Sequence, residues 1–160
     1  GHPERPDRHR AIVSAMGDAF AHWTHYKAPK ASRDQLELVH HSGYIDQIFD
    51  ATSNISDLVP LDADTWAGAH SLETALRAAG GACLAVDLVM QEKAPTAFSA
   101  MRPPGHHAEP DRRWGFVCFP VRQSRRAMHR LSGGLTGWRL LILTCITATA
   151  RKQPFGMMPA

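Results

Sequence analysis

The stretch from Ser71 to Glu92 constrains the fold most, because it reads as one long helix with a continuous apolar face. Glu73 lies in its first turn, where the helix dipole favours a negative charge. Gly80 and Gly81 inside this helix should cost about 1 kcal/mol each relative to alanine, so we expect another segment to pack closely there. The apolar face recurs at steps of three and four residues and comprises Leu72, Ala75, Leu76, Ala79, Cys83, Val86 and Met90.

The segment after this helix reads as a buried strand. Pro95 ends the helix, and residues 96–101 form a short apolar run bounded by prolines. Such a run is typical of a strand inside a parallel sheet. The alternation of strand, helix and strand along the chain predicts an α/β fold, with a mostly parallel sheet flanked by helices.

Four shorter stretches precede the long helix. Residues 10–23 and a helix that Ser42 can cap show the spacing of one helix face, whereas residues 35–39 alternate like a short strand. Residues 52–60 read as a loop. The apolar positions are Ile12, Met16, Phe20 and Trp23 in the first helix and Ile45, Ile48 and Phe49 in the second.

Composition argues against several classes of protein. The 160 residues suit one globular domain, and an apolar content of 44% suffices for a core. No run approaches the roughly 18 apolar residues of a membrane helix. Cys83, Cys118 and Cys145 are widely spaced without a C-x-x-C pair, so they predict neither a disulfide framework nor a thiolate zinc site. We therefore expect a cytoplasmic protein without a membrane partner.

Charge divides the chain into two parts. All fifteen acidic residues lie between Glu4 and Asp111, where nine Lys and Arg leave a net charge of −6; from Arg112 onward nine basic residues and no acid give +9. A folded surface normally mixes both signs, so the last part is either a basic interaction tail or sequence of a different origin. No helix-turn-helix or zinc-finger pattern accompanies these charges, so we expect no specific nucleic-acid partner.

Two adjacent histidines, His106 and His107, lie in the segment that carries chemistry, residues 101–109. This segment follows the predicted strand 96–101, and open α/β sheets place active sites beyond the carboxyl ends of their strands. Two prolines restrict the loop and Gly105 permits a sharp turn. Adjacent imidazoles can act as base and acid in one hydrolysis near neutral pH.

A histidine pair is a weak signal by itself. A bare pair is more often polar surface, and we interpret His40 and His41 in that way. The second pair has a specific context: Arg-Pro-Pro-Gly-His-His-Ala at 102–108, followed by Trp-Gly-Phe at 114–116. This pattern resembles the catalytic loop of the zinc-dependent histone deacetylase family, which includes bacterial acetylpolyamine amidohydrolases and acetoin-utilisation proteins.

Four further segments resemble that family in the expected order. Residues 2–8 look like its opening motif, 39–45 like its next landmark, 61–65 like the loop after it and 71–81 like its long helix. The resemblance covers residues 1 to about 119. It implies the N-terminal part of a deacetylase domain, with an incomplete three-layer fold of the arginase/deacetylase type. Because the chain opens directly on a motif, we expect further sequence before it.

The resemblance also implies roles for individual residues. His107 would be the general base and His106 its partner in hydrolysing an acetyl amide on lysine or a polyamine, while a zinc ion polarises the acetyl carbonyl. Phe116, which follows Gly115, would line the narrow channel for the acyl-bearing chain. Asp64 would approach the substrate from the rim of the pocket. The oligomeric state is left open.

The zinc ligands of the family do not appear in this chain. They should come from an Asp-x-His step on the next strand and from a later Asp, but no acidic residue follows Asp111. A smaller departure is Val117, which displaces the cysteine that commonly follows Gly-Phe in the family. We therefore expect zinc for the family, no metal ligand in this chain and no activity.

A change of reading frame would explain the tail. Each new codon takes the third base of one residue's codon and the first two bases of the next. Residues 144–159 are then compatible with DVHHGNGTEAAFWDDA, which contains the zinc-binding strand end of the family, and residues 124–129 with IAARHA. We interpret residues 120–160 as an out-of-frame, poorly packed basic tail, with the change between about residues 116 and 123. The alternative is a natural basic arm on a non-catalytic interaction protein.

Overall fold

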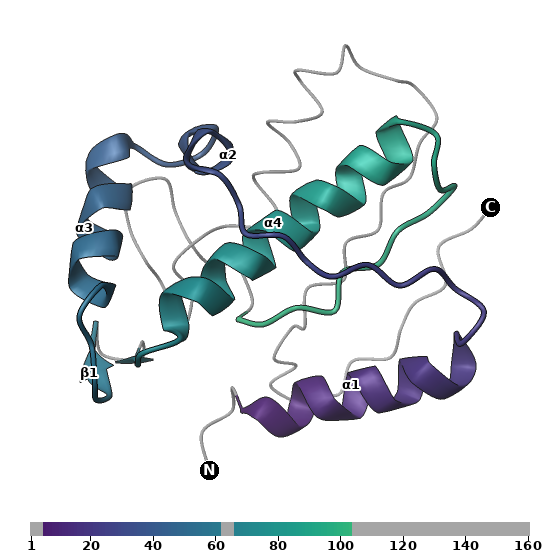
Figure 1. The fold of residues 1–160 in the computed structure, drawn as a ribbon, viewed down its shortest axis with the longest axis horizontal. Helices are drawn as coiled ribbons and strands as arrows, with labels where there is room; N and C mark the ends of the chain where they lie inside the picture. The colour runs from purple at the N-terminus through teal and green to yellow at the C-terminus, as the bar shows by residue number, and fades with distance from the viewer. Residues whose placement is uncertain (1–4, 62–65, 104–160) are drawn as a thin grey trace, which may run out of the picture.

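The computed structural model describes residues 5–61 and 66–103 (Figure 1). Three helices, α2, α3 and α4, contact one another, while α1 lies apart from them on the other side of a long connecting segment (Figure 1). The elements in chain order are α1 (Pro6–Ala19), α2 (Arg33–Glu37), α3 (Ser42–Thr52), β1 (Val59–Pro60), β2 (Trp66–Ala67) and α4 (Ser71–Met90).

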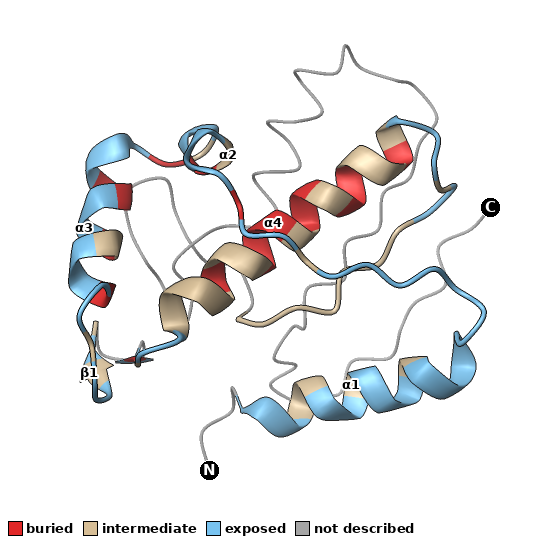
Figure 2. Cartoon of the chain, viewed as in Figure 1, coloured by how far each residue is buried: buried red, intermediate tan, exposed pale blue. Residues whose placement is uncertain are grey.

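The long helix α4 is the central support of this part of the fold, as its apolar face predicts. It begins at Ser71 as expected and ends at Met90, slightly before the expected end. Glu92 has a φ of 57°, in the left-handed region that cannot continue a right-handed helix. Burial extends beyond the predicted face (Figure 2). The buried residues are Ala75, Ala78, Ala79, Gly80, Ala82, Cys83, Ala85, Val86 and Val89.

A connecting segment, residues 28–31, crosses α4 at Gly80. A Cβ atom at Gly80 would overlap the carbonyl oxygen of Pro29 and lie 2.7 Å from the backbone nitrogen of Ala31. The Ala31 N–H donates to the carbonyl oxygen of Leu76 at 2.9 Å. Only a residue without a side chain allows so close a crossing. The close packing predicted from the two adjacent glycines is confirmed.

Charged side chains tie the same segment to α4. Arg77 donates from Nη1 to the carbonyl oxygen of Ala28 at 2.7 Å and pairs with Glu73 one turn earlier at 2.9 Å. Lys30 lies 3.4 Å from the same Glu73 carboxylate. The Arg77 hydrogen bond, helped by Lys30, holds the pKa of Glu73 below its ordinary value. A backbone hydrogen bond, the close approach at Gly80 and these charged contacts therefore all hold residues 28–31 against α4.

The expected strand at residues 35–39 is wrong, because residues 35–37 belong to α2. Ser32 and Gln35 form a capping box: the Gln35 N–H donates to Ser32 Oγ at 3.2 Å, and the Ser32 N–H donates to Gln35 Oε1 at 3.0 Å. Leu36 is 3% exposed and Leu38 is 39% exposed, although a strand would place both on one face. The cap therefore overrides the alternating pattern.

Helix α3 provides the centre of the described core. Ile45 and Ile48 are fully buried, as their spacing predicts, and Phe49 packs against them. The predicted cap is wrong by one residue, since α3 begins at Ser42 and His41 takes the N-cap position without a side-chain bond. The buried core cluster comprises Ala31, Leu36, Tyr44, Ile45, Ile48, Ala75 and Ala79.

Helix α1 differs from its prediction at both ends. It begins at Pro6, whose fixed φ suits the first helical position, and it ends at Ala19. Phe20 and Trp23 therefore lie beyond the helix, in contact with each other at a ring-centroid distance of 4.5 Å. Of the four residues of the expected apolar face, only Ile12 and Met16 therefore belong to the helix.

The mostly parallel sheet stays a prediction. Within residues 5–61 and 66–103 the only strands are β1 and β2, an antiparallel pair in which Val59 faces Ala67 and Pro60 faces Trp66. The loop expected at residues 52–60 is confirmed for 53–58, since Thr52 ends α3 and residues 59–60 form β1. Residues 96–101 were expected to form a strand, but they lie in neither helix nor strand. A strand needs a neighbour, and this segment has no strand beside it in the described part.

Candidate functional site

The residues assigned to catalysis and substrate binding lie outside the described residues. These residues are His106, His107, Gly115, Phe116 and Asp64, and the tail at 120–160 lies outside as well. The structure describes what leads to them on each side: the hairpin of β1 and β2, which brackets Asp64, and residues 94–103, which run up to the histidine pair.

The hairpin is fixed to the start of α4. The Gly68 N–H donates to Ser71 Oγ, and the Ser71 N–H donates to the Gly68 carbonyl oxygen, both at 2.9 Å. Ala67 is completely buried, whereas Trp66 on the opposite face of β2 is 56% exposed. Residues 66–68, which follow the loop that contains Asp64, are therefore anchored to the start of α4.

The approach to the histidine pair is held between α1 and α4. On the α4 side, a Cβ at Gly81 would lie 3.3 Å from Met101 Cγ and 3.4 Å from Ser99 Oγ, so this glycine admits both side chains. On the α1 side, His9 Nε2 lies 2.8 Å from the carbonyl oxygen of Ala100 and donates to it. The two partners are 91 residues apart, so no local pattern could reveal this contact.

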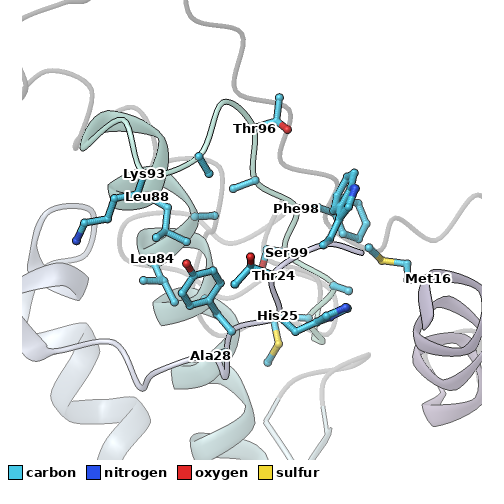
Figure 3. A pocket seen from close by; sticks show the side chains of 18 of the residues that line it. Met16, Thr24, His25, Ala28, Leu84, Leu88, Lys93, Thr96, Phe98 and Ser99 are labelled. Carbon is cyan, nitrogen blue, oxygen red and sulfur yellow. The ribbon is translucent and has the colours of Figure 1, made fainter. Parts of the chain in front are cut away.

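A groove of about 610 Å³ opens along this approach. We call it the α1–α4 groove; residues of α1, 23–28, the second half of α4 and 93–101 line it. Figure 3 shows Leu84 and Leu88 of α4 on one side and Phe98 on the other. Thr24, His25 and Ser99 add polar atoms to a mainly apolar lining.

The interpretation of His40 and His41 as polar surface is half wrong. His40 is only 4% exposed, and its ring stacks on Tyr44 with centroids 4.8 Å apart. The His40 N–H donates to the carbonyl oxygen of Leu36 at 2.9 Å, which turns the chain inward between α2 and α3. His41 is exposed. Adjacent imidazoles thus have opposite environments because the turn between the helices separates them.

Burial perturbs the pKa of two titratable groups on α4. Burial, with a smaller contribution from Asp87, raises the pKa of the Cys83 thiol to about 11, which leaves little thiolate at neutral pH. Burial also raises the pKa of Asp87. Among the described residues, no three His, Cys, Asp or Glu gather closely enough to hold a metal ion. None of the described helices is long and apolar enough to cross a membrane.

The backbone matches a solved deacetylase structure. The crystal structure of the HDA15 HD domain aligns with a TM-score of 0.76 at 27% sequence identity, over 82% of this chain and 38% of that chain. The fold is therefore that of a deacetylase domain, of which this chain covers a part. This match confirms the expected fold class at the level of the family.

Sequence comparison leads to the same family. Residues 2–120 match the histone deacetylase domain family. A histone deacetylase-like amidohydrolase of Pseudomonas aeruginosa is 37% identical over 121 residues, covering 74% of this chain and 31% of that protein. Histone deacetylase 15 of Arabidopsis thaliana is 35% identical over 120 residues, covering 72% of this chain and 21% of that protein. The chain belongs to the histone deacetylase family, and it spans about a third or less of the length of these relatives.

Proposed function

We propose that this chain derives from a zinc-dependent amidohydrolase that removes an acetyl group from acetyl-lysine or an acetylpolyamine, and that the chain itself does not catalyse the reaction. The observation that carries the first half is the family match over residues 2–120, which includes the complete Arg-Pro-Pro-Gly-His-His-Ala motif. Family membership supports the reaction type, and the acylated amine is a further part of the proposal.

We assign two kinds of residue to the substrate site: the histidine pair for proton transfer, and other residues for contact with the substrate. His107 is the proposed general base, and His106 is its partner in proton transfer. Phe116, with Gly115 before it, lines the path of the acyl-bearing chain, and Asp64 meets the substrate at the rim. The described contacts of Ala100 with His9 and of Met101 with Gly81 support this assignment, because they hold the chain immediately before the histidine loop.

The residues of this chain do not suit the zinc ion that the family uses. A hydrolytic zinc site takes carboxylate and imidazole ligands with an open position for water, and no carboxylate follows Asp111. Where the ligand carboxylate and imidazole would stand, the chain has Thr144 and Ile146. Neither side chain can hold zinc in the required geometry, so we assign no metal-dependent step to this chain.

The alternative reading frame accounts for this loss. In that frame residues 144–151 are compatible with DVHHGNGT, which restores a carboxylate and an imidazole at positions 144 and 146. Residues 157–159, Met-Met-Pro, leave no choice and force Asp then Ala, in agreement with the same string. The change of charge near Arg112 follows as well, because a shifted frame does not conserve acidic residues.

The decisive experiment is to resequence the gene across codons 115–125, correct the frame there and assay the extended product with added zinc. We expect a long open frame, stoichiometric zinc and deacetylation of an acetyl-lysine peptide that His107→Ala abolishes. A stop codon within a few codons of the corrected frame would refute the frame change. Stoichiometric zinc and turnover in the uncorrected chain would refute its inactivity.

A second candidate function has the charge of the tail in its favour. Nine basic residues without an acid after Asp111 suit a non-catalytic cytoplasmic protein that binds acidic partners. Limited proteolysis distinguishes the two, because an out-of-frame tail should be cleaved before the body. A tail that resists protease as well as residues 5–103 do would favour a natural, folded arm.

A further inference from the structure

His9, near the start of α1, contacts the segment that leads into the histidine loop. Its ring nitrogen Nε2 lies 2.8 Å from the carbonyl oxygen of Ala100, 91 residues further along the chain. Both residues are half-buried, so water competes less for this hydrogen bond than for one at the surface. The neighbouring Arg10 differs, because it forms an exposed pair with Asp7 at the same end of the helix. His9 thus joins α1 to the segment at residues 96–101.

The chemistry of this contact fixes the direction of the hydrogen bond. A carbonyl oxygen can only accept, so the His9 ring must carry a proton on Nε2. The neutral ring with its proton on Nε2 and the doubly protonated ring both satisfy this requirement. A glutamine side chain has a similar reach and can place an amide N–H close to the position of the imidazole Nε2, whereas the shorter asparagine cannot. The contact therefore needs a donor at a defined distance from the α1 backbone.

Two contacts fix the chain immediately before the histidine loop. His9 holds the carbonyl oxygen of Ala100 from the α1 side. Met101 packs at Gly81 on the α4 side, where a Cβ atom would lie 3.3 Å from Met101 Cγ. Ala100 lies six positions before His106, and two of the residues between them are prolines. Proline fixes φ, so few backbone dihedrals remain to compensate for a displaced Ala100.

We infer that His9 is a positioning residue for the proposed general base, His107. It acts through the carbonyl group of Ala100, which sets the direction in which the chain enters the histidine loop. The inference rests on the proposed function, and it assigns a consequence for the reaction to a residue outside that loop. A misplacement of about 1 Å caused far from the reacting atoms can lower a rate about 100-fold, so one hydrogen bond at this point is enough to affect the reaction.

Nuclear magnetic resonance of the full 160-residue chain tests the contact directly. We expect the long-range proton–nitrogen spectrum to show the His9 proton on Nε2. His9→Leu should move the carbonyl carbon resonance of Ala100 to lower frequency, because the oxygen loses a donor. His9→Gln should restore the resonance, and His9→Asn should not. Arg10→Leu, which removes an exposed side chain from the same end of α1, should leave it unchanged; circular dichroism verifies the fold of each variant.

Kinetics of the frame-corrected product tests the consequence for the reaction. We expect His9→Leu to lower kcat about tenfold or more. KM should stay within about twofold, because a general base acts in the transition state and not in substrate binding. His9→Gln should retain most of kcat, since it keeps the donor, and Arg10→Leu should change neither constant.

The outcomes separate this inference from the proposed function. A neutral His9 ring with its proton on Nδ1, or the same Ala100 resonance in His9→Leu and in the unsubstituted chain, would overturn the contact without an assay of activity. If the frame-corrected product is active and His9→Leu keeps its kcat, or His9→Gln loses as much as His9→Leu, the positioning role is refuted and the proposed function stands. A product that is inactive without any substitution would refute the proposed function, and the positioning role would fall with it.

Discussion

Helices α1 and α4 have similar sequence signals and opposite environments. Both show apolar residues at helical spacing, yet α4 contains nine buried residues and α1 contains none. Figure 2 shows the difference as a buried band along α4 and an exposed surface along α1. Small residues on α4 let other segments approach it closely, whereas Met16 of α1 only borders the groove. The spacing of apolar residues predicts a helix, and the segments that pack against the helix decide which of its residues are buried.

One interior glycine from each of these helices offers the sharpest test. Gly80→Ala should destabilise the chain by about 3 kcal/mol, because the new methyl group would overlap the crossing segment at Pro29. Gly17→Ala in α1 meets nothing within 4 Å and should stabilise it by about 0.5–1 kcal/mol. Urea unfolding measures both. Equal effects of the two substitutions would show that the crossing at Gly80 does not exist.

A matched pair of valines repeats the comparison with a loss of volume. Val86→Ala removes two methyl groups from a buried position and should cost about 2 kcal/mol. Val13→Ala on α1, where the side chain is 49% exposed, should change the free energy of unfolding by less than about 0.5 kcal/mol. If denaturant midpoints shift equally, α1 is as well packed as α4 and the contrast fails.

The thiol of Cys83 tests burial on α4 without a mutation. Its pKa of about 11, compared with an ordinary 9.0, lowers the thiolate fraction at neutral pH about 100-fold. We expect alkylation of Cys83 to be slower by at least this factor in the native chain than in urea. Peptide mass spectrometry reads each cysteine separately. Rapid native labelling of Cys83 would mean that α4 opens readily.

The smallest expected effect is the pH dependence of the charged contact on α4. The pKa of Glu73 is lowered in the folded chain, so its pairing with Arg77 and Lys30 stabilises the fold above the ordinary pKa of 4.5. This contribution is lost as the pH falls through the lowered value. Glu73→Gln should therefore lower stability at pH 7 and have no effect at low pH. The exposed Glu92→Gln is the control, and parallel pH profiles would contradict the assignment.

Local patterns predicted those features of the fold that depend on residue type and spacing and not on which segment packs against them. The apolar face of α4, the buried Ile45 and Ile48 of α3 and the close approach at Gly80 all follow from residue type and spacing. The expected strand at residues 35–39 failed because one capping box outweighed a short alternation. The assigned site residues stay predictions, since His106, His107, Gly115, Phe116 and Asp64 lie outside the described residues.

The sequence alone determined the family, through ordered motifs, and the two helices with a clear apolar face, α3 and α4. Tertiary structure decided which face of each element is covered. It turned His40 inward against Tyr44 and left His41 in solvent. It also joined His9 to Ala100 across 91 residues. The contact between His9 and Ala100 forms only when distant segments meet, so no local pattern encodes it.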